Sequence, residues 1–70
     1  MEILAERLLS LRKERGLSQQ EAAVLSGVQY RSYRRYEQGE REPQASVLCA
    51  LADFYKVSTD YLLGRKDTRK

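Results

Sequence analysis

The clearest chemistry in this chain comes from three closely spaced arginines, Arg31, Arg34 and Arg35. At about 100° per residue they fall on one side of a helix, whereas Tyr33 and Tyr36 fall on the other. The aromatic face can anchor the helix on a folded body, and the guanidinium groups then offer forked N–H donors. Such donors match phosphate oxygens and the O6 and N7 acceptors of guanine. The pattern predicts a helix that presents positive charge to an anionic partner; for the segment alone, a merely solvated basic face is the alternative.

These arginines lie in the third of five helices that the apolar spacing predicts. No stretch alternates between apolar and polar residues as a half-buried strand would. In the first helix, Leu4, Leu8 and Leu11 recur at i, i+4 and i+7 and define a core face. The predicted helices span about residues 2–15, 18–26, 29–38, 44–55 and 59–63. The pattern indicates a compact all-α domain.

Local signals mark where these helices begin and end. Ser18 and Glu21 form a capping box at the start of the second helix. Gly27 can adopt the positive φ that a tight reversal needs before the third helix. Pro43 is expected in the first turn of the fourth helix, and Ser58 is expected to cap the fifth. Together, these signals predict a second and a third helix joined by a short turn, which is a helix-turn-helix arrangement.

Length and charge bound the organisation of the chain. Its 70 residues allow one hydrophobic core, so we expect one domain over residues 1–64 and a flexible basic tail over residues 65–70. The formal net charge is +3, and the basic excess lies in the third helix and in the tail. No apolar run is long enough for a membrane span, and the N-terminal segment lacks the apolar region of a signal peptide. We therefore expect a cytoplasmic protein without a membrane partner.

Few residues could perform catalysis or hold a metal. The chain contains no histidine and one cysteine, Cys49, which we expect to be a small core residue because its neighbours are apolar. It has no metal-ligand spacing, no phosphate-binding glycine loop and no GxSxG motif. The carboxylates Glu37, Glu40 and Glu42 interleave with arginines, which is typical of a charge-balanced surface. We therefore expect no enzyme activity, no cofactor and no metal site.

Four stretches and their spacing resemble the XRE helix-turn-helix family of phage repressors and Cro, over about residues 4–64. They are LRKERGLSQQEAA, SGV, RRYEQGEREP and LADFYKVSTDYLLG. The resemblance implies a five-helix, repressor-like DNA-binding domain. It also implies a transcriptional regulator that binds double-stranded DNA sequence-specifically, with the third helix in the major groove. By the same resemblance, we expect a repressor that acts as a homodimer on an inverted-repeat operator.

The resemblance also assigns roles to individual positions. The residues expected to read bases are Gln29, Tyr30, Arg31 and Arg34. The residues expected to contact DNA phosphate are Gln19, Arg35, Gln38 and Arg41. An internal ion pair is expected between Arg12 and Glu37, which makes Glu37 structural. The candidate dimer contacts are Tyr61, Leu62 and Leu63.

Five positions depart from the family pattern, and one of them is Ala22, where leucine is common. Gln29 stands where serine or threonine is usual, so the third helix lacks its ordinary cap. Tyr33 replaces an aliphatic anchor, and its hydroxyl needs a partner if it is buried. Tyr30 is large for a base-reading position: contact with a thymine methyl, stacking on sugar, and cover for the core edge are all open. Glu40 stands where lysine is frequent, which lowers the positive charge that faces the DNA backbone.

Two other function classes compete with a DNA-binding regulator. An antitoxin or accessory module would use the same fold to hold a protein partner, but it would not need the outward arginines together. An amphipathic peptide on a membrane surface is disfavoured, because the basic face is backed by the apolar pattern of a folded domain.

Overall fold

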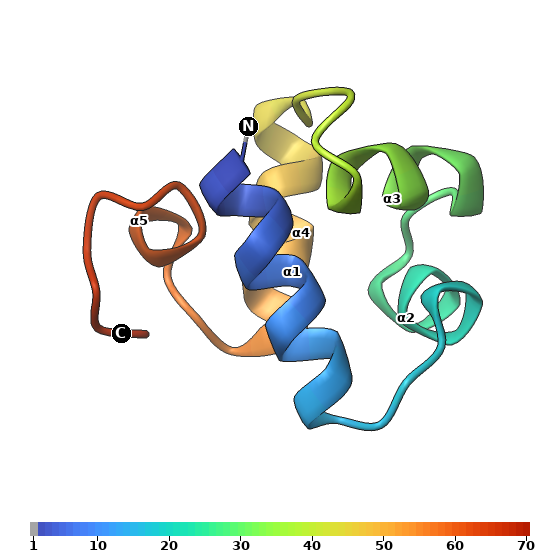
Figure 1. Cartoon of the computed structure of the whole chain (residues 1–70), viewed down its shortest axis with the longest axis horizontal. Coiled ribbons are helices and arrows are strands. Elements are labelled where there is room, and N and C mark those ends of the chain that lie inside the picture. The colour runs from blue at the N-terminus through green and yellow to red at the C-terminus, as the bar shows by residue number, and fades with distance from the viewer. Residues whose placement is uncertain (1) are drawn as a thin grey trace.

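The computed structural model describes residues 2–70, which form five helices and, within that range, no strand. The helices are α1 (Glu2–Glu14), α2 (Gln19–Ser26), α3 (Tyr30–Glu37), α4 (Ala45–Tyr55) and α5 (Thr59–Leu62) (Figure 1). The predicted all-α fold is confirmed, with helix bounds within one or two residues of those expected.

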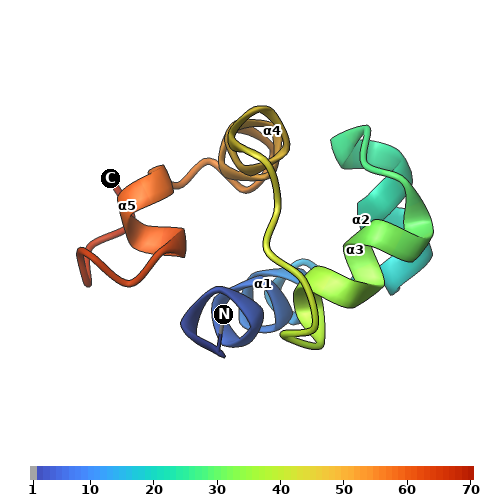
Figure 2. The same ribbon diagram turned by 90° about the horizontal axis from the view of Figure 1, so that it is seen from above.

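Helices α1 and α4 lie between two smaller groups of elements (Figure 2). The pair α2 and α3 lies on one side of them, and α5 lies on the other. Close contacts join α1 to α3 and α5, α2 to α3 and α4, and α4 to α5. The pair α2 and α3 is therefore held by both long helices.

The core lies where these helices meet. Leu4, Leu8 and Leu11 are almost fully buried, as their spacing predicts. Burial of each leucine side chain contributes about 1.5–3 kcal/mol relative to exposure. The other residues of the buried apolar cluster are Ala22, Ala23, Val28, Tyr33, Tyr36, Leu51, Ala52, Tyr55 and Leu62. Tyr33 is the largest fully buried side chain, so it anchors α3 to the core.

The predicted start and end of α2 are both confirmed. The Ser18 hydroxyl accepts from the Glu21 N–H at 3.0 Å, and the Glu21 carboxylate accepts from the Ser18 N–H at 2.8 Å. This reciprocal pair satisfies two N–H groups that a helix start leaves free. Gly27 ends α2 with φ of +77°, the left-handed conformation that glycine adopts most easily. The turn into α3 is therefore as tight as predicted.

Two expectations for α4 are wrong. Pro43 does not lie in its first turn: the helix begins at Ala45, after an extended Gln44 at the N-cap position. Cys49 is exposed rather than part of the core. The buried face of α4 is made by Leu51, Ala52 and Tyr55, and Cys49 lies on a flank of the helix about 100° away from it.

The C-terminal basic segment, residues 65–70, makes specific contacts where a flexible tail was expected. The Arg69 guanidinium donates to both carboxylate oxygens of Glu14, at 2.9 and 2.5 Å. These hydrogen bonds hold the pKa of Glu14 below its usual value. The Arg7 guanidinium donates to the Lys66 carbonyl at 2.6 Å. Two arginines thus tie this segment to α1.

Across residues 2–70, no helix has both the length and the apolar character that a bilayer crossing requires.

Candidate nucleic-acid interface

Helix α3 has two chemically distinct faces, as its spacing predicts. Tyr33 is fully buried and Tyr36 nearly so, whereas Arg31, Arg34 and Arg35 are exposed. Val28, in the turn before the helix, is buried and packs under the junction with α2. The buried face of α3 packs against the core, and the opposite, basic face is exposed to solvent.

The exposed arginines surround an open hollow of about 230 Å³. Its lining residues are Arg31, Arg34, Arg35, Gln38 and Glu40. Among residues 2–70, the three arginines form no ion pair with a carboxylate. Their N–H donors are therefore available to an outside acceptor, and Glu40 adds one negative charge at the rim.

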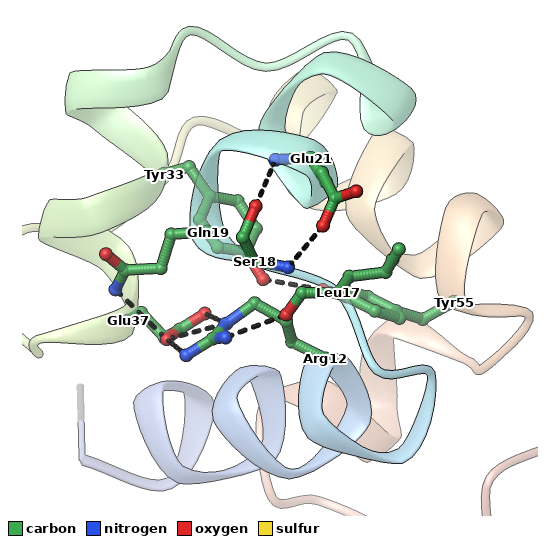
Figure 3. Close-up of polar contacts among 8 residues, drawn as sticks. All are labelled: Arg12, Leu17, Ser18, Gln19, Glu21, Tyr33, Glu37 and Tyr55. Carbon is green, nitrogen blue, oxygen red and sulfur yellow. Dashed lines mark hydrogen bonds and ion pairs between the residues drawn. The ribbon is translucent and has the colours of Figure 1, made fainter.

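The buried hydroxyl of Tyr33 has a partner across the core. Its oxygen lies 2.5 Å from the hydroxyl oxygen of Tyr55 in α4 (Figure 3). Burial raises the pKa of Tyr33 far above its usual value, and burial also raises the pKa of Tyr55. Both phenols are therefore neutral over the physiological range, and one hydroxyl donates a hydrogen bond to the other. The buried Tyr33 hydroxyl therefore has the hydrogen-bond partner that it needs, and Tyr55 of another helix supplies it.

Arg12 and Glu37 form an ion pair at the C-terminal end of α3 (Figure 3). Arg12 Nη2 is 2.8 Å from Glu37 Oε1, and Arg12 Nε is 2.9 Å from Oε2. Arg12 Nη1 also donates to the Leu17 carbonyl at 2.9 Å. Only 3% of the Glu37 side chain and 14% of the Arg12 side chain are exposed. The pair thus ties α1 to α3 and to the loop before α2.

Gln19 joins this pair. Its Nε2 donates to Glu37 Oε1 at 3.2 Å (Figure 3). Burial disfavours the Glu37 carboxylate, but the hydrogen bonds from Arg12 and Gln19 outweigh burial and hold the pKa of Glu37 below its usual value. We call Arg12, Gln19 and Glu37 the internal cluster. No signal in the sequence indicated that Gln19 contacts Glu37.

The start of α3 is as unusual as the sequence suggested. Gln29 occupies the N-cap position but makes no side-chain capping hydrogen bond; instead its Oε1 accepts from the Ser32 hydroxyl at 3.3 Å. Tyr30 follows and is 40% exposed. The Arg34 guanidinium carbon lies 5.6 Å from the centroid of the Tyr30 ring. Tyr30 and Arg34 are therefore neighbours on the outer surface of α3.

The remaining candidate residues lie in three places. Gln38, the C-cap residue of α3, is exposed and lines the arginine hollow. Arg41, in the following loop, is also exposed but is not one of the residues that line the hollow. Leu62 is fully buried in the core, because α5 packs this side chain inward, and it is therefore not available to a second copy. Tyr61 and Leu63 are half-buried, and the guanidinium carbon of Arg7 lies 4.1 Å from the Tyr61 ring centroid.

Within the described range, no group of three or more histidine, cysteine, aspartate or glutamate residues could hold a metal ion.

Comparison with known proteins identifies the family. The family model described as Helix-turn-helix (HTH_3) matches residues 8–62. The chain is 37% identical over 67 residues to the HTH-type transcriptional regulator ImmR of Bacillus subtilis, which covers 96% of this chain and 53% of ImmR. It is 37% identical over 62 residues to the CTXphi transcriptional repressor RstR of Vibrio cholerae, which covers 89% of this chain and 55% of RstR.

A solved structure gives the same result for the fold. The DNA-binding domain of the P22 C2 repressor matches with a TM-score of 0.77 and 32% identity, over 86% of this chain and 79% of that domain. The chain spans about half the length of the curated relatives it matches. These relatives are named as transcriptional regulators and repressors, a class that is not enzymatic. Because the family model covers most of the chain, and relatives of this identity align along nearly its whole length, the chain belongs to the helix-turn-helix family.

Proposed function

We propose that this chain is a sequence-specific, double-stranded-DNA-binding transcriptional regulator that acts as a repressor. The observation that carries the proposal is the group of three arginines on α3, which have no carboxylate partner within residues 2–70 and line one open hollow. A helix whose one face packs on the core and whose other face is basic fits the major groove, where its first residues reach base edges. The names of the relatives support the same reading.

The proposed contacts divide into two classes. Base edges are read from the first turns of α3 by Gln29, Arg31 and Arg34, and the Tyr30 ring lies beside Arg34. Phosphates are held by Gln19, Arg35, Gln38 and Arg41. Contacts of the first class carry sequence information, whereas those of the second set affinity and register. Gln19 Nε2 donates one hydrogen to Glu37, so its phosphate contact uses the second Nε2 hydrogen. Gln19 also lies at the first position of α2, where free N–H groups and the helix dipole favour an anion.

The regulator is proposed to act as a homodimer on an inverted-repeat operator in the cytoplasm. One helix of this size covers a single half-site, and a two-fold dimer matches the symmetry of two inverted half-sites. Tyr61 and Leu63 are the candidate contacts that keep exposed surface, since Leu62 is in the core.

Selection of bound sequences from random double-stranded DNA, with the whole chain, tests this function. The expected result is an enriched motif with two inverted half-sites separated by about one helical turn, roughly 10 base pairs. A triple variant in which Arg31, Arg34 and Arg35 become alanine should enrich nothing. If the natural chain enriches no sequence, or enriches the same motif as the triple variant, the proposed function is wrong.

An antitoxin or accessory protein-binding module is the second candidate. One observation favours it: Val24 and Leu25 on α2 are 72% and 62% exposed and line a shallow hollow of about 330 Å³. Exposed apolar side chains of this size are typical of partner contacts, although scattered ones are normal on any surface. Replacement of both by glutamine should leave the selected DNA motif unchanged if DNA binding is the main function.

A further inference from the structure

Tyr30 begins α3, and its ring lies next to the guanidinium of Arg34 one helical turn later. The Arg34 guanidinium carbon is 5.6 Å from the ring centroid, within the range of a cation–π contact. We propose that Tyr30 is a positioning residue, which holds Arg34 for base reading and does not itself read a base. This inference rests on the proposed DNA-binding function and assigns the role of one residue in it.

The helix geometry brings the two side chains together. Residues four positions apart are neighbours on a helix surface, with Cβ atoms about 5–6 Å apart. Tyr30 is 40% exposed, whereas Tyr33 and Tyr36 of the same helix are buried. Of the three tyrosines of α3, Tyr30 is thus the one whose ring can meet an outward-facing arginine.

A ring holds a guanidinium group in a different way from a carboxylate. A carboxylate uses the N–H donors, which lie in the guanidinium plane, whereas an aromatic face binds the charge and leaves those donors free. Within residues 2–70, the Arg34 guanidinium makes no ion pair and lies beside the Tyr30 ring. Both donors of its fork therefore remain for the O6 and N7 acceptors of guanine.

Positioning matters because arginine is a flexible side chain. It loses rotamer freedom when it binds, and this loss lowers affinity unless the side chain is already restrained. Contact with the ring restrains Arg34 in the free protein, and the contact strengthens when the groove excludes water. Tyr30 should therefore act on the base that Arg34 contacts, and on no other.

The test compares Tyr30→Leu with Tyr30→Phe on the motif selected by the natural chain. Leucine removes the ring but favours a helix at least as well as tyrosine does, whereas phenylalanine keeps the ring face. Tyr30→Leu should lower discrimination at the Arg34 base by about threefold to tenfold, and Tyr30→Phe should retain it. Affinity for non-specific DNA should be equal in all three proteins, and their urea unfolding midpoints control for stability.

An Arg34→Ala background separates positioning from direct reading. If Tyr30 acts through Arg34, Tyr30→Leu causes no further loss of discrimination in that background, so the two changes are not additive. A full additional loss, or a loss at a base other than the Arg34 base, would show that Tyr30 reads DNA itself and would overturn the proposal.

A measurement without DNA completes the test. In nuclear magnetic resonance spectra of the free protein, the Arg34 side-chain protons should show an upfield ring-current shift that Tyr30→Leu abolishes and Tyr30→Phe keeps. Absence of this shift, or unchanged discrimination in Tyr30→Leu, overturns the positioning role alone. If the natural chain selects no DNA motif, the proposed function fails, and the positioning role fails with it even when the ring-current shift is present.

Discussion

Arg12 and Arg34 carry the same side chain in two opposite settings. Arg12 lies in the internal cluster, where its donors are taken by Glu37 and by the Leu17 carbonyl. Arg34 lies on the outer face of α3, beside an aromatic ring and the hollow that it lines with other arginines. Arg12 contacts α3 through Glu37, the last residue of the helix, whereas Arg34 is itself a residue of α3.

One short helix, α3, thus carries a residue that stabilises the fold, Glu37, and a residue that is free to bind a partner, Arg34. A buried ion pair whose partner is removed leaves a charge without water or counter-charge, so its effect falls on folding. An exposed guanidinium with free donors contributes little to folding, and its effect falls on whatever it binds. Substitutions in the internal cluster should therefore lower stability, whereas substitutions of the outer arginines should lower DNA binding.

Glu37→Ala should give the largest loss of stability. It leaves Arg12 buried and unpaired, and such a change costs about 3–5 kcal/mol of unfolding free energy. Urea unfolding followed by circular dichroism measures it. Glu40→Gln is the control, because Glu40 is exposed and a surface change of this kind stays within about 0.5 kcal/mol. Equal effects of the two substitutions would show that the internal cluster does not hold α3.

Acid should also weaken the internal cluster. Protonation of Glu37 should lower the unfolding free energy by less than Glu37→Ala does. The pKa of Glu37 is lower in the folded protein than its ordinary value of 4.5. The unfolded chain therefore takes up the proton first, so this stabilisation is present above about pH 4.5 and is lost as the pH falls through the folded-state value. The unfolding free energy measured from pH 7 downwards should fall in that window, and less steeply in Glu37→Gln. Parallel curves for the two proteins would contradict the cluster's role.

Tyr33→Phe should have a smaller effect on folding. It leaves the buried hydroxyl of Tyr55 without its partner, which costs about 1–3 kcal/mol. Tyr36→Phe is the matched control, because the Tyr36 hydroxyl makes no hydrogen bond within residues 2–70. Thermal unfolding of both variants should rank Tyr33→Phe clearly below Tyr36→Phe. Coincident unfolding curves would mean that the bond between the two phenols adds nothing.

Arg69→Ala should have the smallest structural effect, confined to the C-terminal segment. Its contact with Glu14 is half-exposed and screened by salt. The Ser58 N–H donates to the Arg69 carbonyl at 2.7 Å, so loosening of the segment should reduce the protection of that amide from hydrogen exchange. Amides of α1 should exchange as before. Unchanged Ser58 exchange would indicate that the segment is flexible already, as the sequence suggests.

The sequence predicted best what depends on near neighbours along the chain. The capping box of Ser18 and Glu21, the turn at Gly27 and the leucine face of α1 all rest on spacings of a few residues, and all are confirmed. Pro43 and Cys49 were misplaced, because local composition does not say which residue caps α4 or which flank of it meets the core.

Contacts between distant residues were harder to predict. The sequence showed that Tyr33 needs a partner but not that Tyr55, in another helix, supplies it. The contact of Gln19 with Glu37 has the same origin, since only the packing of α2 beside α3 brings the two together. Such pairings depend on the tertiary arrangement, which propensity and periodicity do not contain.

Arg34 should read one base of the operator, whereas the internal cluster stabilises the fold. Titration of Arg34→Ala against the selected operator, and against operators with one base pair changed, measures this base preference. The separation of roles predicts a loss of discrimination at one position of about 1–3 kcal/mol in binding free energy, with the unfolding free energy within about 0.5 kcal/mol of the natural chain. Unchanged base preference, or a loss of stability like that of Glu37→Ala, would contradict it.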